Sequence, residues 1–174
     1  MPTLIVVSGL PGTGKSSIAE GIGRHRGAPV LSVDPIESAM VRAGLRPTFE
    51  TGLAAYLVAE VLADQHLASG LDVVIDAVSS VDEAREWWRT LARNHGATLK
   101  VIVCIVSDEG VHRQRLEQRR RGLALPETSW DAVEARRLEW SDWAAPFLVL
   151  DAMDSTAANL ARAQTFLETM PGDP

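Results

Sequence analysis

One glycine-rich stretch near the N-terminus, GLPGTGKS at residues 9–16, restricts the possible folds of this chain more than any other feature. Its glycines, lysine and serine have the spacing of a Walker A phosphate-binding loop. A strand-like apolar run precedes it at residues 3–8, and a helix-compatible segment follows it to about residue 26. Because the full spacing and both flanks are present, we favour this interpretation over a glycine-rich turn that binds no nucleotide.

The residue types in this Walker A stretch suit the binding of a nucleoside triphosphate. Glycine permits positive φ angles and lets backbone N–H groups point at a phosphate, and the N-terminus of the following helix attracts anions. Lys15 can reach the β- and γ-phosphates, and the hydroxyl of Ser16 is the usual ligand of the bridging Mg²⁺. The sequence therefore predicts ATP and Mg²⁺ as cofactors, while GTP stays open as a donor. The predicted nucleotide-binding residues of the loop are Gly9, Pro11, Gly12, Thr13, Gly14, Lys15, Ser16 and Ser17.

Length and composition indicate one ordinary globular domain. A chain of 174 residues suits a single domain, which we expect to span residues 1–174. The proportions of 46% hydrophobic and 23% charged residues are typical of such a domain. The single cysteine, Cys104, excludes an internal disulfide and a cysteine-rich metal site. Its apolar neighbours predict a buried and inert thiol.

Charge and hydropathy narrow the range of partners. The net charge of -6 argues against a broad nucleic-acid surface. The N-terminal apolar run leads directly into the Walker A stretch and lacks a basic segment before it, so we expect a strand and no signal peptide. No apolar run reaches the roughly 18 residues that cross a bilayer, so we expect no membrane partner. We expect a cytoplasmic protein that is a monomer or a homodimer.

Two of the predicted strands end in a carboxylate. Residues 29–33 form a short apolar strand that stops at Asp34, and residues 71–76 form another that ends at Asp76. Ligands of open α/β sheets gather at this end of the strands. Asp34 can therefore act on an acceptor group, and it can also cap the next helix with Pro35 at the first position. Asp76 suits a Walker B-like role, in which it holds the Mg²⁺ shell or orients an acceptor hydroxyl.

Helices and further strands complete an alternating pattern. Two helices between residues 35 and 69 form the expected substrate-holding lobe, at about residues 35–69. Another helix follows a capping box at residues 80–83. Strands are predicted at residues 98–106 and 147–151, and by analogy of fold the loop 152–155 after the last strand is a candidate neighbour of the adenine.

The helix after the fourth strand is rich in arginine. Asp108 or the serine before it is expected to cap this helix, and Gly122 to end it. On such a helix Arg115 and Arg119 lie about one turn apart on the same face. A run of charges is usually a solvated face, yet here one guanidinium can stack on adenine and another can neutralise phosphate charge. We therefore predict that residues of about 119–137 form a mobile, arginine-bearing lid.

Together these motifs resemble the small P-loop kinases of the AAA-33 type, whose broader relatives are chloramphenicol phosphotransferase, gluconate kinase, shikimate kinase and the kinase domain of polynucleotide kinase. The resemblance covers almost the whole chain and rests on GLPGTGKSS, VDPIESAM, VVIDAV, HRQRLEQRRRG and a final LVLD. It implies an α/β P-loop NTPase fold of three layers, with a five-stranded parallel sheet in the order 2-3-1-4-5 and helices on both faces.

The resemblance also implies roles for individual residues. Lys15 and Ser16 would hold phosphate and metal, and Asp34 would deprotonate or orient the acceptor hydroxyl. Asp76 would support the metal. Arg115 and Arg119 match the arginines at the start of the lid, and it stays open whether Arg113 or Arg120 takes one of their roles.

The predicted function is that of an ATP-dependent phosphotransferase, which moves the γ-phosphoryl group to a hydroxyl of a small molecule. Residues 43–56 match none of the named enzymes, so the resemblance does not name the acceptor. One alternative is a polynucleotide 5′-hydroxyl kinase, against which the acidic net charge counts. Another is a nucleotide-binding regulator without an acceptor of its own, because a Walker A loop alone indicates binding and not transfer.

Overall fold

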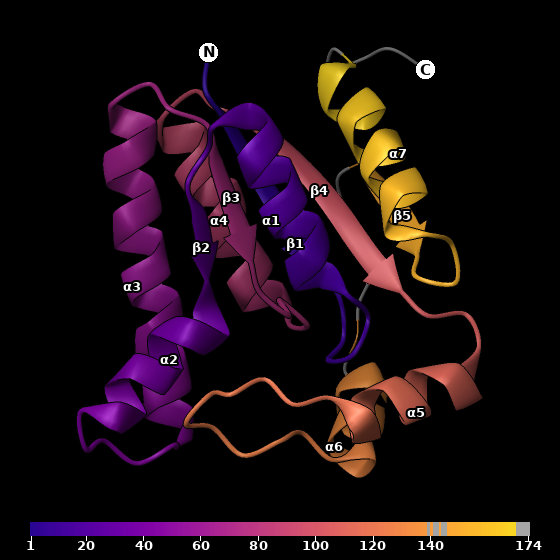
Figure 1. Cartoon of the computed structure of the whole chain (residues 1–174). Coiled ribbons are helices and arrows are strands. Elements are labelled where there is room, and N and C mark those ends of the chain that lie inside the picture. The colour runs from indigo at the N-terminus through magenta and orange to yellow at the C-terminus, as the bar shows by residue number, and fades with distance from the viewer. Residues whose placement is uncertain (139, 141–142, 144–145, 170–174) are drawn as a thin grey trace.

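Parallel strands form a five-stranded sheet in this computed structural model, which describes residues 1–138, 140, 143 and 146–169. The strand order is β2-β3-β1-β4-β5, and Figure 1 shows helices on both faces of the sheet. The predicted order, the parallel pairing and the three layers are therefore confirmed. The strands are β1 (Thr3–Ser8), β2 (Val30–Ser32), β3 (Val73–Asp76), β4 (Thr98–Ile105) and β5 (Phe147–Asp151). The helices are α1 (Lys15–Arg26), α2 (Val33–Arg42), α3 (Phe49–Ala68), α4 (Asp82–Asn94), α5 (Glu109–Gln118), α6 (Trp130–Leu138) and α7 (Thr156–Glu168).

The central strand β1 belongs to both hydrophobic cores. Ile5 and Val7 share one core with residues of α1 and α7. Leu4 and Val6 share the other core with residues of α3 and α4. All four side chains are fully buried, and each such burial contributes roughly 1.5–3 kcal/mol to folding. A strand that is buried on both faces needs a continuous apolar run, which explains the sequence directly before the Walker A stretch.

The parallel register brings the carboxyl ends of the strands to one edge of the sheet. Val7 on β1 pairs with Asp76 on β3, and Ser32 at the end of β2 pairs with the same aspartate. Asp34 follows Ser32 by two residues, and the Walker A stretch follows β1. The Walker A stretch, Asp34 and Asp76 therefore lie at the same edge of the sheet, where α/β sheets bind their ligands.

The predicted capping role of Asp34 is wrong. Helix α2 begins at Val33 and has Ser32 as its N-cap residue, so Asp34 lies within the first helical turn. The chain passes from β2 into α2 without a loop, because Ser32 ends the strand and its hydroxyl donates to Asp76. The carboxylate of Asp34 still lies at the helix N-terminus, where the helix dipole favours a negative charge.

The predicted capping box before α4 is also wrong. The N-cap residue of α4 is Val81, and no side chain caps the helix. Just before it, Ser79 has a left-handed backbone conformation with φ 47°. The carbonyl of Ser80 accepts a hydrogen bond from Arg85. The turn at Ser79 thus fixes the entry into the helix in place of a box at residues 80–83.

Helix α5 is shorter than the sequence predicts. Asp108 caps it as expected, and its side chain accepts a hydrogen bond from the backbone N–H of Val111 at 2.8 Å. The helix ends at Gln118, however, and Arg119 has an extended backbone with φ -64° and ψ 137°. The predicted end at Gly122 is therefore wrong. Because the backbone is extended here, Arg119 and Arg121 point toward different partners. On one helical turn their like charges would lie close together and repel each other.

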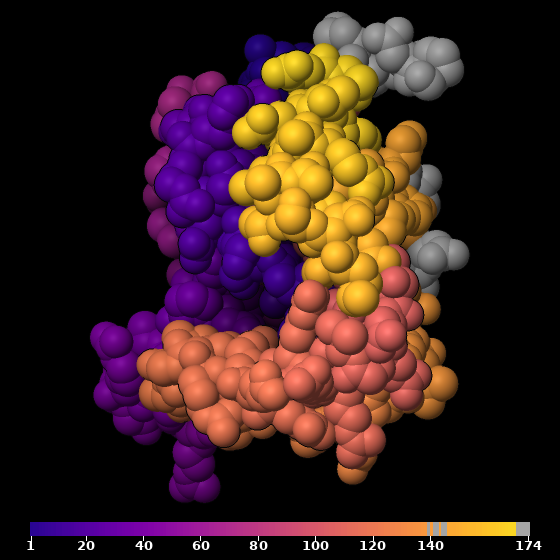
Figure 2. Space-filling view, turned by 45° about the vertical axis from the view of Figure 1, so that its right-hand side comes forward, coloured from indigo at the N-terminus to yellow at the C-terminus, as the bar shows by residue number. Residues whose placement is uncertain are grey.

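The predicted lid segment, residues 119–137, crosses from the end of α5 toward α2. Figure 1 shows its loop next to α2, and Figure 2 shows it as a continuous band from α5 across to the indigo and violet part of the chain. The backbone N–H of Ala124 donates to the hydroxyl of Ser38 on α2 at 2.9 Å. Helix α6 then carries the chain back.

The sequence predicts that Cys104 is buried and that no apolar run crosses a membrane. Cys104 on β4 is buried and unpaired, and burial raises the pKa of its thiol to about 12. The predicted burial of the thiol is therefore confirmed. Within the described residues, no helix combines the length and the apolar character needed to cross a membrane.

Candidate nucleotide and phosphoryl-transfer site

The Walker A stretch forms the turn between β1 and α1, as its sequence predicts. Gly9 has φ 147° and Gly12 has φ 90°. A Cβ atom at Gly9 would lie 2.4 Å from the carbonyl oxygen of Cys104 and 2.7 Å from Oγ1 of Thr13, so no side chain fits there. At Gly12 a Cβ atom would lie 3.2 Å from the His112 ring. These two positions require glycine for its conformation and for its size.

Side chains from outside the loop hold the Walker A stretch in place. The hydroxyl of Thr13 donates to the carbonyl of Leu10 at 2.8 Å within the loop. His112 on α5 is buried, and its Nε2 lies 2.8 Å from the carbonyl oxygen of Pro11. Because a carbonyl only accepts hydrogen bonds, this nitrogen must carry the proton. The ring of Trp130, the first residue of α6, packs edge-on against His112 at 5.2 Å between centroids.

Lys15 and Asp76 form a buried ion pair behind the loop. Lys15 Nζ lies 3.9 Å from Asp76 Oδ1, and both side chains are almost fully buried. The hydroxyl of Ser32 donates to Asp76 Oδ2 at 3.0 Å, whereas Asp76 Oδ1 makes no hydrogen bond to the described residues. A buried carboxylate oxygen without a hydrogen bond to the described residues suits a hard cation such as Mg²⁺, and the hydroxyl of Ser16, which lines the same end of the Walker A stretch as Lys15, is a second candidate ligand.

The described residues contain no group of three or more His, Cys, Asp or Glu side chains that could hold a metal ion. Mg²⁺ often binds through one or two protein oxygens together with water and phosphate oxygens. Ser16 and Asp76 would therefore fit a magnesium ion that is shared with a nucleotide, and they would not fit an all-protein metal cage.

A cleft of about 460 Å³ lies in front of the Walker A stretch, and we call it the cationic cleft. Besides Gly12, Gly14, Ser16 and Ser17 of the loop and α1, its lining contains one lysine and three arginines and no acidic residue. Oriented N–H donors and guanidinium groups around one cleft favour a polyanion. The cations that line it are Lys15, Arg115, Arg119 and Arg121.

Arg119 has few acceptors among the described residues. Its Nε and Nη2 atoms are buried and make no hydrogen bond to them, and the nearest carboxylate, that of Glu127, lies 3.8 Å from Nε. Burial lowers the pKa of this guanidinium, and the neighbouring charge of Arg121 lowers it further. Burying a charged donor without an acceptor is unfavourable. An anion in the cationic cleft would supply the missing acceptor.

A second cavity of about 260 Å³ adjoins the cationic cleft, and we call it the β5 cavity. The two share Gly14, Ser17 and Arg115 in their linings. The Nη1 atom of Arg115 donates to the carbonyl of Ala152 at 3.0 Å, which places the guanidinium beside the loop 152–155. A planar group in this cavity could therefore contact both Arg115 and the loop.

Asp34 is paired with an arginine of the lid segment. Arg121 Nη1 lies 2.6 Å from Asp34 Oδ2, although the two residues are 87 positions apart in the sequence. Arg121 also donates to Glu127 at 3.2 Å and to the carbonyl of Pro126 at 3.0 Å. The lid segment therefore contacts the carboxylate that the sequence singles out as a candidate base, and the same arginine lines the cationic cleft.

The loop after β3 is fixed through one residue, Ser79. Its N–H donates to the Tyr56 hydroxyl at 3.1 Å, and its carbonyl accepts from Arg85 Nε at 2.9 Å. Its hydroxyl oxygen accepts from the indole N–H of Trp88 at 3.2 Å. Ser79 is fully buried and has a positive φ. Such strain persists only where the surroundings over-determine the conformation, so this loop is held rigidly beside Asp76.

The sequence profile of one family, AAA_33, which is described as an AAA domain, matches residues 4–140. This chain belongs to the AAA_33 family. The matched range includes the Walker A stretch, both strand-end aspartates and the lid segment, so the family predicted from these motifs is confirmed. No curated protein matches this AAA_33 chain in sequence.

Solved structures share the fold of this AAA_33 protein. A candidate kinase from Chloroflexus aurantiacus J-10-fl superposes with a TM-score of 0.78, at 23% identity over 96% of this chain and 99% of the other. A sugar kinase from Janibacter sp. HTCC2649 gives 0.72, at 19% identity over 98% and 97% of the two chains. Chaetomium thermophilum Kti12 in complex with ADP-AlF3 gives 0.73, at 17% identity over 97% and 100%. At these identities the likeness establishes the fold alone.

The structure brings most predicted site residues of the AAA_33 chain to one place. The loop residues, Lys15 and Arg115 line the cationic cleft or its neighbour, as does Arg119. Gly9 and Pro11 instead act from behind, through the close contact at Cys104 and the bond from His112. Arg113 and Arg120, the alternatives for the roles of Arg115 and Arg119, line neither the cationic cleft nor the β5 cavity.

Arg113 pairs with Glu117 at 3.0 Å, and Arg120 bonds the carbonyl groups of Glu117 and Arg119. Sequence reasoning also missed three residues that touch or support the site, namely Arg121, His112 and Arg85. Arg121 was within reach of prediction, since it is part of the run RRR at residues 119–121. Because the sequence predicts a helix that continues to residue 122, it did not indicate that Arg121 would point toward Asp34. Nothing in the local sequence marks His112 or Arg85.

Proposed function

We propose that this protein is an ATP-dependent phosphotransferase, which moves the γ-phosphoryl group of ATP to a hydroxyl group of a small molecule. The observation that carries the proposal is the cationic cleft, where Lys15 and the arginines of α5 and the lid segment surround the Walker A stretch. Cations around a transferred phosphoryl group supply most of the catalysis in this reaction class.

The cleft and the β5 cavity together suit a nucleotide. The phosphates would lie against the loop N–H groups and Lys15, and the base would extend into the β5 cavity beside Arg115. Ser16 and Asp76 would hold Mg²⁺, which would neutralise phosphate charge when bound. The arrangement leaves Arg119 and Arg121 on the lid side of the same cleft.

Asp34 is the group that we assign to the acceptor. In the transfer, the bond between the γ-phosphorus and its bridging oxygen breaks as the acceptor oxygen forms a new bond to phosphorus. The acceptor proton passes to the Asp34 carboxylate, which otherwise orients the hydroxyl. Arg121 must then leave Asp34 and bind the phosphoryl oxygens. It can reach them because it lines the cationic cleft and also contacts Asp34.

The acceptor would bind between the substrate lobe, residues 35–69, and the lid segment, residues 119–137. The hydrogen bond from Ala124 to Ser38 already connects these two parts. A lid that closes over the acceptor excludes water and so suppresses hydrolysis of ATP. The fold similarity to a sugar kinase supports a small acceptor with hydroxyl groups, so sugars belong in any substrate screen.

The test is to incubate the protein with Mg²⁺ and ATP and pooled hydroxyl compounds: sugars, nucleosides, amino acids, aminoglycosides and phenicols. Mass spectrometry would detect a compound that gains one phosphoryl group. We expect such an adduct with the natural chain and none with Lys15→Ala. If ATP binds and no pooled compound is phosphorylated, the proposal of a small-molecule acceptor loses its support, and a nucleotide-binding regulator becomes the better account.

A further inference from the structure

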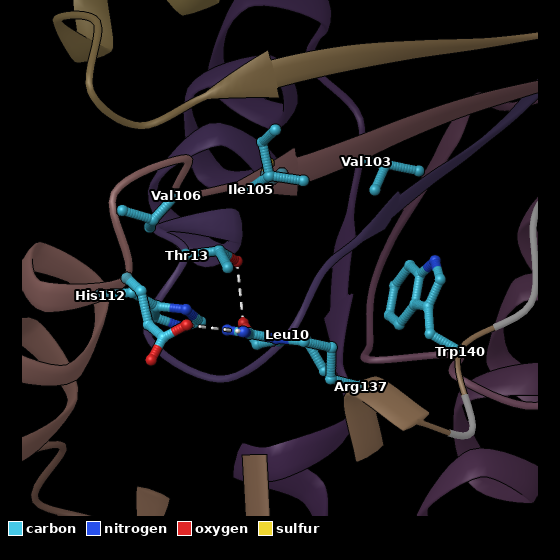
Figure 3. A pocket seen from close by; sticks show the side chains of 10 residues that line it. Leu10, Thr13, Val103, Ile105, Val106, His112, Arg137 and Trp140 are labelled. Atoms are coloured by element: carbon cyan, nitrogen blue, oxygen red, sulfur yellow. Dashed lines mark hydrogen bonds and ion pairs between the residues drawn. The ribbon is translucent and has the colours of Figure 1, made fainter. Parts of the chain in front are cut away.

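A third cavity of about 360 Å³ lies at the end of β4, between the Walker A stretch and the helices α5 and α6. We call it the β4 cavity. Figure 3 shows His112 on one side of it and Trp140 on the other, with Leu10 of the Walker A stretch between them. Its volume lies within the range of small-molecule sites, which is about 300–1,000 Å³.

The β4 cavity is separate from the proposed reaction site. It shares no lining residue with the cationic cleft, and it shares only Thr13 and Cys104 with the β5 cavity. The strand order places β1 between β4 and the pair β3 and β2, so Asp76 and Asp34 lie on the other side of the Walker A stretch. A ligand in this cavity would therefore not occupy the place of the nucleotide phosphates or of the hydroxyl acceptor.

Most of the wall of this cavity is apolar. Val103, Ile105 and Val106 come from the end of β4, and Trp140 follows α6. Ile105 keeps 37% of its surface exposed, although the five residues before it on β4 are buried. A flat indole next to branched aliphatic side chains suits an aromatic ring, which packs by offset or edge-to-face contact.

One acidic side chain, that of Glu109, lies at the rim of the cavity. Glu109 and Arg137 line it, and Arg137 Nη1 lies 3.5 Å from Glu109 and 3.2 Å from Glu134. Glu134 does not line the cavity, but it is the nearer partner of Arg137, so Arg137 is shared and neutralises the charge of Glu109 only in part. The ring of Trp140 is electron-rich, and the guanidinium of Arg85 already lies 5.1 Å from its centroid. The rim therefore favours a ligand that carries one positive charge.

We propose that the β4 cavity binds a small aromatic amine, with its ring against Trp140 and its ammonium group at Glu109. The ligand would contact Leu10 directly and would also touch His112, whose ring holds the carbonyl of Pro11. Occupancy of the cavity thereby changes the rigidity of the Walker A stretch and the affinity for ATP. This site goes beyond the phosphotransferase proposal and does not depend on it, since binding requires no acceptor and no turnover.

The test uses three probes with the same ring: 2-phenylethylamine, 2-phenylethanol and phenylacetate, titrated at up to millimolar concentration by calorimetry. We expect the amine to bind about tenfold more tightly than the carboxylate, the effect of one charge-assisted contact. Ile105→Trp should fill the cavity and abolish binding of the amine. The matched control is Val149→Trp on β5, where the valine is 38% exposed and lies outside the cavity; it should leave binding intact.

Two further measurements complete the test. Glu109→Gln should remove the preference for the amine, and the saturating amine should change the Kd of ATP by about fivefold, the lower end of usual couplings. Failure of all three probes to bind, or binding that survives Ile105→Trp, overturns the site. Binding that is lost in Asp34→Asn and kept in Ile105→Trp would place the amine at the acceptor site, which also overturns it. An unchanged Kd for ATP overturns the link to the Walker A stretch.

Discussion

At the scale of single residues, Arg121 is the contact on which the proposed chemistry most depends. It pairs with Asp34 at 2.6 Å and lines the cationic cleft, so it can pass from the carboxylate to a phosphoryl group. We predict that Arg121→Gln lowers kcat/KM for phosphoryl transfer by roughly 100-fold, as the loss of one transition-state donor does. The matched control is Arg113→Gln, because Arg113 does not line the cationic cleft and contacts Glu117 and the ring of Trp130 instead.

Steady-state kinetics of the two variants would check this prediction. Arg113→Gln should stay within about twofold of the natural chain, as expected for an exposed ion pair. Equal losses in both variants would mean that general charge, and not the position of Arg121, governs the rate.

Cys104 gives a residue-scale prediction about protonation. Burial raises the pKa of its thiol to about 12, so the thiol stays protonated at pH 8, and the thiolate is the species that reacts with alkylating reagents. We expect iodoacetamide to leave the folded protein unlabelled at pH 8 and to label it fully after denaturation. Rapid labelling of the folded chain, seen by mass spectrometry, would contradict the buried position of Cys104 on β4.

At the scale of elements, the loop between β3 and α4 depends on Arg85. This side chain is fully buried, bonds the carbonyl of Ser79, and lies 5.1 Å and 5.0 Å from the ring centroids of Trp140 and Trp143. We predict that Arg85→Met lowers the free energy of unfolding by about 3 kcal/mol, because it breaks a buried polar network. Chemical denaturation would measure the change.

The control for Arg85 lies on the same helix. Arg93 is 65% exposed and pairs with Glu86, so Arg93→Met should change the free energy of unfolding by less than about 1 kcal/mol. A similar loss in both variants would show that α4, and not the loop at Ser79, is what Arg85 supports.

The element boundaries show where local sequence reasoning ends. The strands were predictable because buried parallel strands need apolar runs, and Asp108 was predictable because a cap acts within a few residues. The early end of α5 was not, since Arg119 and Arg121 find Glu127 and Asp34 only after the chain has crossed to α2. The turn at Ser79 likewise depends on Tyr56, Arg85 and Trp88 from two helices.

At the scale of the whole molecule, the resemblance to the P-loop kinases predicts the sheet order, whereas the candidate site follows from one edge of a parallel sheet. The Walker A stretch follows β1, Asp34 lies two residues after β2, and Asp76 ends β3, so the register brings all three to one edge. His112 and Arg121 approach the site from α5 and from the lid segment. Their placement depends on tertiary packing that no local pattern records.

The most direct test of the account as a whole is to compare Asp34→Asn with the natural chain, using the acceptor identified by mass spectrometry. We predict that kcat falls by at least about 100-fold, as expected on loss of a proton acceptor. The Kd of ATP should change by less than about threefold, because Asp34 lies outside the lining of the cationic cleft and the β5 cavity. Full transfer activity in Asp34→Asn would contradict the assignment of Asp34 to the acceptor and with it the proposed site.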